Sequence, residues 1–304
     1  MTTPSRGGSL SALSYRAGWG LACRLPERTV GVALRRAADL AWSRRGAGVR
    51  QLEANLSRAV PGDDEAVLRD LSQRAMRSYL RYWGEVFRLP RWSAGQLSER
   101  VVTRHEERLR EPLARGQGVV AALPHMGNWD LAGAWACSQG MPLTTVAERL
   151  QPEQLYAEFL RHRNSLGMDV LPLTGGAAPL PVLEQRLAEG GFVCLLADRE
   201  LSRRGVPVPL LGETARLPIG PALLAARTGA VLLPVTTSYA GSSMRLDFHQ
   251  PVEVGSGVAG MRAATAGVAA AFTAAIRRDP ADWHMLQRVF EADLAARPRR
   301  VVSP

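Results

Sequence analysis

The sequence contains no lysine, so every fixed positive side-chain charge belongs to an arginine. The basic residues number 38 against 28 acidic ones, and the formal net charge is +10. Arginine pairs with phosphate and carboxylate groups through two nitrogens and does not lose its charge in practice. The excess lies in the first 110 residues, where 20 arginines face 11 acidic residues. This asymmetry favours an anionic partner, either a nucleic acid or an anionic lipid.

Aromatic residues are also scarce, at 6% of the chain. Single-stranded nucleic acid is bound on exposed aromatic platforms, yet Trp19, Trp42 and Trp83 fall within helical patterns. We therefore expect no nucleic-acid partner and an anionic membrane surface instead. The basic residues alone leave both partners open.

Cysteine is rare, and long apolar runs are missing. Cys23, Cys137 and Cys194 form no CxxC pair, which indicates a reduced, cytosolic compartment. Paired Cys and His spacings and HExxH are absent, so we expect no metal. No run approaches the ~18 apolar residues of a membrane span. Arg16 and Arg24 interrupt the N-terminal apolar stretch, so we expect neither a signal peptide nor a transmembrane helix.

Apolar residues at helical spacing predict that residues 1–110 form a helical region. One expected helix begins near Asp63 or Asp64. Its opposite face is basic, as are the faces of the helices before it. Basic amphipathic helices with Trp and Leu are typical of proteins that bind at a membrane interface. The alternative is a helical layer whose arginines are simply solvated. The arginines concerned are Arg16, Arg35, Arg44, Arg45, Arg74, Arg77, Arg81 and Arg88.

Beyond Arg115, apolar strands alternate with helices, which predicts an α/β fold with a mostly parallel central sheet flanked by helices. Residues 111–304 are the expected catalytic core, onto which the N-terminal helices pack. The expected strands are 118–123, 143–147, 168–173, 192–198, 230–239 and 244–254. The expected helices are 128–139, 152–166, 180–188, 218–228 and 261–278.

Several ionisable residues stand where these strands end. Ligands of open α/β sheets bind outside the carboxyl ends of the strands, and neighbouring strands are about 5 Å apart. The side chains therefore converge on one cleft. His125 ends the first strand, Glu148 ends the second, and Asp198, Arg199 and Glu200 end the fourth.

His125 is the candidate general base. A neutral histidine accepts the proton of an attacking hydroxyl, and a carboxylate that fixes its tautomer makes it a better base. If Asn128 caps the next helix, Asp130 lies in the first turn and its carboxylate can fold back towards His125. Asp198 or Glu200 can fill the same role from the neighbouring strand.

One motif competes with this interpretation. Residues 255–260 read GSGVAG, which matches the GxGxxG dinucleotide fingerprint. That fingerprint belongs in the first βαβ unit with an acidic residue after the next strand, whereas here it follows the last strand. We interpret it as a turn. GxSxG is absent, so a serine nucleophile is unsupported.

The stretch PHMGNWD resembles the bacterial membrane-associated acyltransferases that share a His-X4-Asp motif. His125 and Asp130 match that motif. The superfamily includes the lipid A lauroyl and myristoyl transferases and the glycerophosphate acyltransferases. Other blocks resemble one branch, the actinobacterial phosphatidylinositol mannoside acyltransferases. These blocks are TTVAERL, LYAEFLRHRNSLG, VLPLTGG, VCLLADREL, LPIGPALLA and PADWHML. The resemblance covers nearly the whole chain.

The resemblance implies transfer of a long acyl group, typically palmitoyl, from acyl-CoA to a mannose hydroxyl of a phosphatidylinositol mannoside. Glu148 and Arg163 match polar residues of the family's cleft. A glutamate of this branch works with the histidine. Asp198 stands at its expected position here, with Glu200 as the alternative. Other acceptors, such as a lysophospholipid or another glycolipid, stay open.

The expected reaction is direct attack of the hydroxyl on the thioester, with no covalent enzyme intermediate. Amides at the start of the Asn128 helix would stabilise the oxyanion. The 3′,5′-ADP part of CoA needs cationic contacts. Acyl-CoA is a donor substrate, and no permanently bound cofactor is expected. The enzyme is expected to be peripheral to the cytoplasmic face of the plasma membrane. The candidate phosphate ligands are Arg199, Arg203, Arg204 and Arg216.

Overall fold

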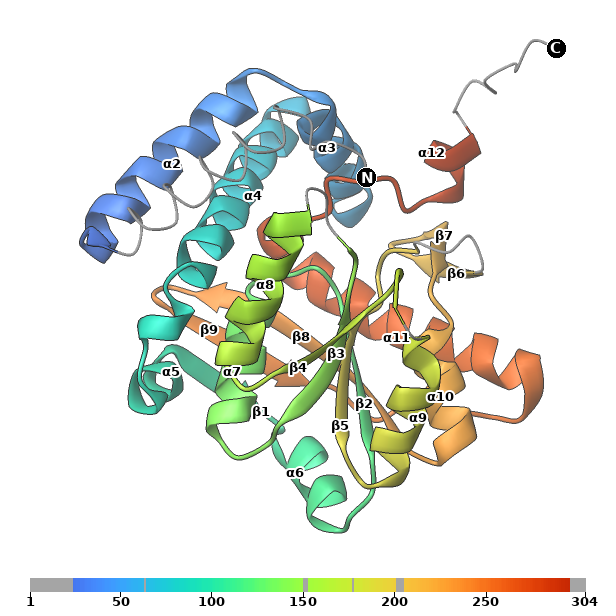
Figure 1. Cartoon of the computed structure of the whole chain (residues 1–304). Coiled ribbons are helices and arrows are strands. Elements are labelled where there is room, and N and C mark those ends of the chain that lie inside the picture. Colours follow the sequence, from blue (N-terminus) through green and yellow to red (C-terminus); the bar gives the residue numbers. More distant parts are fainter. Residues whose placement is uncertain (1–23, 63, 150–152, 177, 201–204, 296–304) are drawn as a thin grey trace, which may run out of the picture.

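A seven-stranded sheet between two layers of helices forms the centre of the molecule (Figure 1). The computed structural model describes residues 24–62, 64–149, 153–176, 178–200 and 205–295. The strand order is β1-β9-β8-β2-β5-β3-β4. The strands β8, β2, β5, β3 and β4 run parallel, whereas β9 is antiparallel to β8. The bounds are β1 Val101–Arg104, β2 Val119–Leu123, β3 Leu143–Ala147, β4 Asp169–Pro172, β5 Phe192–Leu196, β8 Val231–Ala240 and β9 Ser243–Phe248.

The central strands are apolar because helices cover both of their faces. All five residues of β2 are buried. Val120 and Ala122 pack into the core shared with α9, α10 and α11, whereas Val119 and Leu123 face the core shared with α7. The predicted α/β fold with a mostly parallel sheet is confirmed. The helices of the core are α6 Glu107–Ala114, α7 Trp129–Ser138, α8 Glu153–Ser165, α9 Pro179–Ala188, α10 Gly220–Thr228, α11 Gly257–Arg278 and α12 Glu291–Ala295.

The N-terminal part contributes helices and one strand. The helices α2 (Glu27–Ser43), α3 (Ala47–Ala59) and α4 (Glu65–Val86) pack on one another through a small apolar cluster. As predicted, Asp64 caps α4, accepting a hydrogen bond from the Val67 amide at 2.8 Å. The short helix α5 (Ala94–Arg100) then leads into β1.

The expectation that residues 1–110 are helical throughout is wrong at β1. This strand pairs in parallel with β9 at the edge of the sheet, so the sheet itself extends into the N-terminal part. The first expected helix falls mostly within residues 1–23, outside the described residues. The membrane-associating role of the region stays a prediction.

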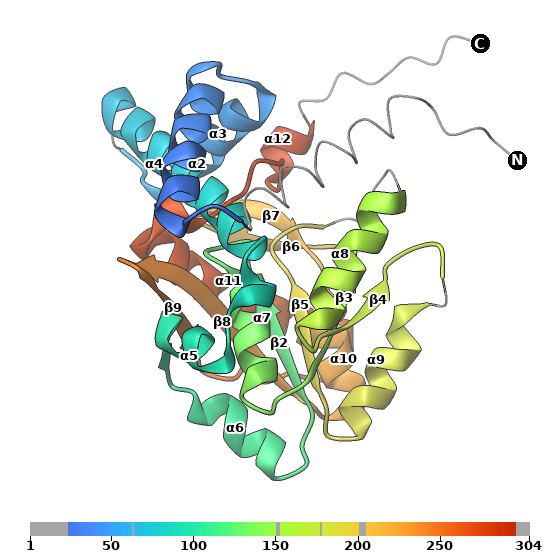
Figure 2. The same cartoon turned by 60° about the vertical axis from the view of Figure 1, so that its left-hand side comes forward.

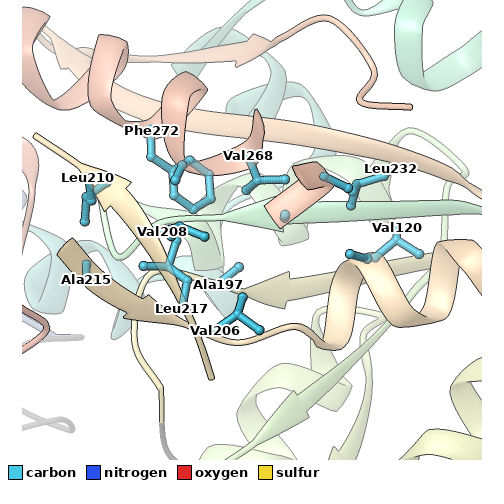
Figure 3. Packing of buried hydrophobic residues seen from close by; sticks show 14 of the residues in the cluster. Val120, Ala197, Val206, Val208, Leu210, Ala215, Leu217, Leu232, Val268 and Phe272 are labelled. Carbon is cyan, nitrogen blue, oxygen red and sulfur yellow. The ribbon is translucent and has the colours of Figure 1, made fainter. Parts of the chain in front are cut away.

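A hairpin that the sequence did not predict covers the C-terminal half of α11. Its strands are β6 (Val206–Leu210) and β7 (Glu213–Leu217), which pair antiparallel. Figure 3 shows Phe272 of α11 packed against Val208 of β6. The hairpin thereby encloses the core beside the carboxyl end of β5.

Within the described residues, α11 has the length and apolar composition of a membrane-crossing helix. Its buried face includes Val268, Phe272 and Ile276, and core helices of soluble proteins share both properties. The GSGVAG segment forms the tight turn that starts this helix. A Cβ on Gly260 would lie 2.1 Å from the carbonyl oxygen of Gly255, so the glycines serve a close backbone contact.

Candidate active site

The site is centred on His125, which follows β2 by two residues. The neighbouring strand β5 runs parallel to β2, and Leu123 stands opposite Leu196 in the register. Two residues beyond each of these lie His125 and Asp198. The parallel register therefore brings the imidazole and the carboxylate together at one edge of the sheet.

Asp198 accepts three hydrogen bonds and is fully buried. Its Oδ1 lies 2.6 Å from the ring Nδ1 of His125, and its Oδ2 accepts from the His125 amide at 2.8 Å. The indole Nε1 of Trp283 donates to Oδ2 at 3.0 Å. Burial alone would raise the pKa of Asp198, but the His125 ring and these hydrogen bonds lower it below its ordinary value.

The geometry fixes the tautomer of His125. An ionised carboxylate only accepts hydrogen bonds, so Nδ1 of the ring must donate its proton to Asp198. The other nitrogen, Nε2, is then left with a lone pair. The His125 side chain is 22% exposed, so this lone pair can reach a substrate hydroxyl. The pair has the arrangement of a general base and its orienting carboxylate.

A segment from the far end of the sequence clamps the His125 loop. The amide of His284 donates to the His125 carbonyl at 2.8 Å, and the Gly127 amide donates to the Asp282 carbonyl at 2.8 Å. Met126 and Trp283 form an antiparallel bridge between these two bonds. The loop is thus held like a strand although it lies outside the sheet.

The expectation that Asp130 folds back towards His125 is wrong. Its buried carboxylate instead forms a bidentate ion pair with Arg163 of α8, at 2.7 and 3.1 Å. The hydroxyl of Tyr82 on α4 also donates to it, at 2.7 Å. The first turn of α7 thus carries Asp130 towards α4 and α8. Burial alone would raise the pKa of Asp130, but Arg163 and the hydrogen bonds lower it.

Asn128 caps α7, as predicted. Its Oδ1 accepts from the Leu131 amide at 2.9 Å. Its Nδ2 donates to Glu85 of α4 at 2.8 Å, and Tyr239 donates to the same carboxylate oxygen at 3.0 Å. The first amides of an α-helix have no partner within the helix, and those of α7 begin four residues after His125 in the chain.

The other strand-end residues form a second polar group. Arg199 donates to Glu148 at 2.9 Å, and the Glu148 side chain is about half exposed. Glu200 points towards the start of the hairpin, where a Cβ on Gly205 would lie 2.5 Å from its Oε2. Since Nδ1 of His125 is already bonded to Asp198, Glu200 does not orient the ring.

The remaining cationic residues predicted for the site have different surroundings. Arg163 is engaged by Asp130, as described above. Arg216 bonds Glu291 at 2.9 Å and the Gly205 carbonyl at 2.6 Å, so it ties the hairpin to α12. Arg203 and Arg204 lie outside the described residues. Among the described residues no cluster of potential metal ligands is found.

An apolar cavity extends from the site beneath α7. Trp129 and the Asp130–Arg163 pair line it at the site. The Trp129 ring stands edge-on to His125, with 5.3 Å between ring centroids. The deeper lining is aliphatic and aromatic and includes Leu123, Ala132, Trp135, Leu143, Phe192 and Phe248.

No role was predicted for Tyr82, Glu85 or Trp283. The only signal for Trp283 was its place in PADWHML, one of the blocks that carry the family resemblance. Tyr82 and Glu85 lie within the helical pattern of α4, where nothing marks them as neighbours of His125. Their contacts depend on how α4 packs against α7.

Comparison with known proteins shows the family of the chain. The model of the bacterial lipid A biosynthesis acyltransferase family matches residues 10–292. A phosphatidylinositol mannoside acyltransferase from Mycolicibacterium smegmatis is 43% identical over 290 residues, which cover 95% of this chain and 94% of that protein. A protein of the same name from Mycobacterium tuberculosis is 42% identical over 93% of this chain and 89% of its own length.

The resemblance noted in the sequence is therefore confirmed. The chain belongs to the bacterial lipid A biosynthesis acyltransferase family, with phosphatidylinositol mannoside acyltransferases among its relatives.

Proposed function

We propose that the protein transfers a long-chain acyl group, palmitoyl, from acyl-CoA to a mannose hydroxyl of a phosphatidylinositol mannoside. The observation that carries the reaction type is the hydrogen-bonded pair of His125 and Asp198, beside which Trp129 lines an apolar cavity. The names of the relatives support the acceptor.

In the proposed reaction, Nε2 of His125 takes the proton of the acceptor hydroxyl. The oxygen attacks the thioester carbonyl carbon and forms a tetrahedral intermediate. The carbon–sulfur bond then breaks, the imidazolium returns its proton to the CoA thiolate, and the ester is released. Asp198 stabilises the imidazolium while it carries the proton.

The surroundings of His125 supply the other requirements. First-turn amides of α7 are suited to receive the negative charge of the intermediate, because the positive end of the helix dipole lies there. The cavity beneath α7 is suited to hold the acyl chain. Glu148 and Arg199 lie at the neighbouring strand end, where polar acceptor or CoA groups would meet the enzyme.

Both substrates are amphiphilic, so we also propose that the enzyme docks on the cytoplasmic face of the plasma membrane through its basic N-terminal helices. An arginine near an anionic membrane contributes about 1 kcal/mol of attraction. The exposed arginines of α2 support this.

Radiolabelled palmitoyl-CoA and a phosphatidylinositol mannoside acceptor test the proposal, with products separated by thin-layer chromatography. His125→Asn keeps a polar side chain but removes the base, and we expect the rate of labelled-glycolipid formation to fall by about 10²–10⁴-fold. His105→Asn is the matched control, because His105 is an exposed residue away from the site whose positive φ asparagine tolerates.

Asp198→Asn should lower the rate as well, since an amide cannot stabilise the imidazolium. If the wild-type enzyme transfers the label to other lipids but not to the phosphatidylinositol mannoside, the proposed acceptor is rejected. Labelled palmitate released equally with and without acceptor would indicate a hydrolase.

A further inference from the structure

A second, larger groove lies between α2, the end of α4 and the turn that joins β8 to β9. Its empty volume is about 1950 Å³. Helices α2 and α4 pack against each other (Figure 2), and in Figure 1 α2 lies on the outer side of α4. Among the described residues three acidic side chains line it: Glu27, Glu85 and Asp282. Six arginines line it: Arg28, Arg35, Arg77, Arg81, Arg88 and Arg100.

The arginines form two groups. Four of them are held in place by neighbours: Asp39 binds Arg77, Glu85 binds Arg81, Glu27 binds Arg100, and Arg88 donates to the Leu25 carbonyl. Within the described part of the chain, no ion pair is found for Arg28 or Arg35. Both are exposed on α2. The groove thus combines oriented guanidinium groups with two whose charge is not neutralised by a nearby carboxylate.

The groove and the catalytic loop share a wall. Glu85 binds Arg81 on the groove side and receives a hydrogen bond from Asn128 of the catalytic loop. Ser78 donates to Asp282 at 2.6 Å and lies 2.9 Å from Nε2 of His284, whose amide bonds the His125 carbonyl. The groove therefore lies one layer of side chains away from His125.

The positive charge of the groove indicates which kind of ligand it binds. The segment that precedes α2 in the sequence, residues 1–23, contains two arginines and no acidic residue, so charge opposes its binding in the groove. Phosphate diesters pair well with forked guanidinium groups. The outer face of α2 adds exposed Val32 and Leu40 beside the groove, which suits a surface that meets acyl chains.

We propose that this groove binds the phosphate of an anionic phospholipid in the bilayer, separately from the acceptor and donor at His125. Occupancy fixes which face of the enzyme meets the membrane, and through the shared wall it places the catalytic loop next to the lipid surface. The inference rests on the membrane association proposed above, but its test does not involve acyl transfer.

The test is cosedimentation of the full chain with vesicles of phosphatidylcholine alone or mixed with phosphatidylglycerol, without donor or acceptor. Arg28→Gln with Arg35→Gln removes two groove charges. Arg36→Gln with Arg44→Gln is the matched control, because both residues are exposed at α2 but do not line the groove. Circular dichroism checks that both double variants fold.

We expect the wild-type protein to bind only vesicles that contain phosphatidylglycerol. The double substitution in the groove should weaken vesicle binding about tenfold more than the control double substitution. Equal losses in the two pairs would overturn the proposal in favour of diffuse surface charge. Absence of wild-type binding would also overturn it. Release by inorganic phosphate, at an ionic strength matched with chloride, would show that the site takes free phosphate and would reject the lipid as its ligand.

Discussion

At the scale of single residues, one buried carboxylate orients the base and another holds the framework. Asp198 receives its hydrogen bonds from His125 and Trp283, whereas Asp130 is surrounded by Arg163 and Tyr82. Both carboxylates have a pKa below the ordinary value despite burial. The aspartate of the His-X4-Asp motif thus fixes α7 to α8 and α4.

Asp130→Asn should destabilise the protein by about 3–5 kcal/mol at neutral pH, because it leaves the buried Arg163 without its counter-charge. The wild-type contribution is fully present above the ordinary carboxyl value of 3.8 and is lost as the pH falls through the lower folded-state pKa. Urea unfolding at a series of pH values should therefore show the two proteins converging in strongly acidic solution.

Asp70→Asn is the control for that series, since Asp70 pairs with Arg74 on the exposed face of α4. It should change the free energy of unfolding by about 1 kcal/mol or less. A stability gap between Asp130→Asn and wild type that does not narrow with acid would contradict the assigned ion pair.

At the scale of elements, the sequence predicted those strands that lie in the middle of the sheet. Strands covered on both faces, such as β2 and β5, are continuous apolar runs and are visible in any sequence pattern. The hairpin β6–β7 escaped because Pro207 and Pro209 interrupt its pattern, and proline is tolerated in a sheet only at edges. The edge strand β1 escaped because its four residues, VVTR, form no apolar run and only the first is buried.

The candidate site was predictable to the extent that it depends on strand ends. His125 and Asp198 follow neighbouring parallel strands, so their proximity follows from the register. The partner of Asp130 was not predictable, because it depends on how α4 and α8 pack around α7. The role of Trp283 depends likewise on a loop that closes over the sheet from a distant segment.

A prediction at the scale of elements concerns the turn between β2 and α7. Gly127 has a φ of 56°, and a Cβ there would lie 2.7 Å from the Thr237 carbonyl oxygen. Gly127→Ala must therefore displace the catalytic loop, and a misplacement of about 1 Å can cost about 10²-fold in rate. We expect a loss of this size in the radiolabel assay.

Gly140→Ala at the other end of α7 is the matched control. Gly140 has a φ of 78° but no atom within 4 Å of its Cβ position. It should lose about 1–2 kcal/mol of stability from backbone strain alone and keep its activity. Equal activity of both variants would mean that the position of the loop does not limit the reaction.

At the scale of the whole molecule, the N-terminal helices are part of the catalytic structure. The cluster on the α7 side of the sheet includes Tyr82, Val86 and Leu89, and the sheet includes β1. The division at residue 110 stays a prediction of the sequence, but contacts that cross it reach Asn128 and Asp130.

A fragment of residues 111–304 should consequently fail to fold on its own. We expect no cooperative thermal transition by circular dichroism or calorimetry, in contrast with the full chain, because the fragment exposes the apolar surface that α4, α5 and β1 cover. A sharp transition near that of the full chain would show an independent core.

The clamp formed by residues 282–284 also has a consequence for synthesis. The loop that carries His125 leaves the ribosome early, but Asp282, Trp283 and His284 are among the last described residues to follow it. Nascent chains released before this segment emerges can build most of the sheet, yet they lack the indole that binds Asp198 and the backbone that holds the His125 loop. Incomplete products should therefore be inert towards acyl-CoA, which would protect the cell from thioester loss on unfinished chains.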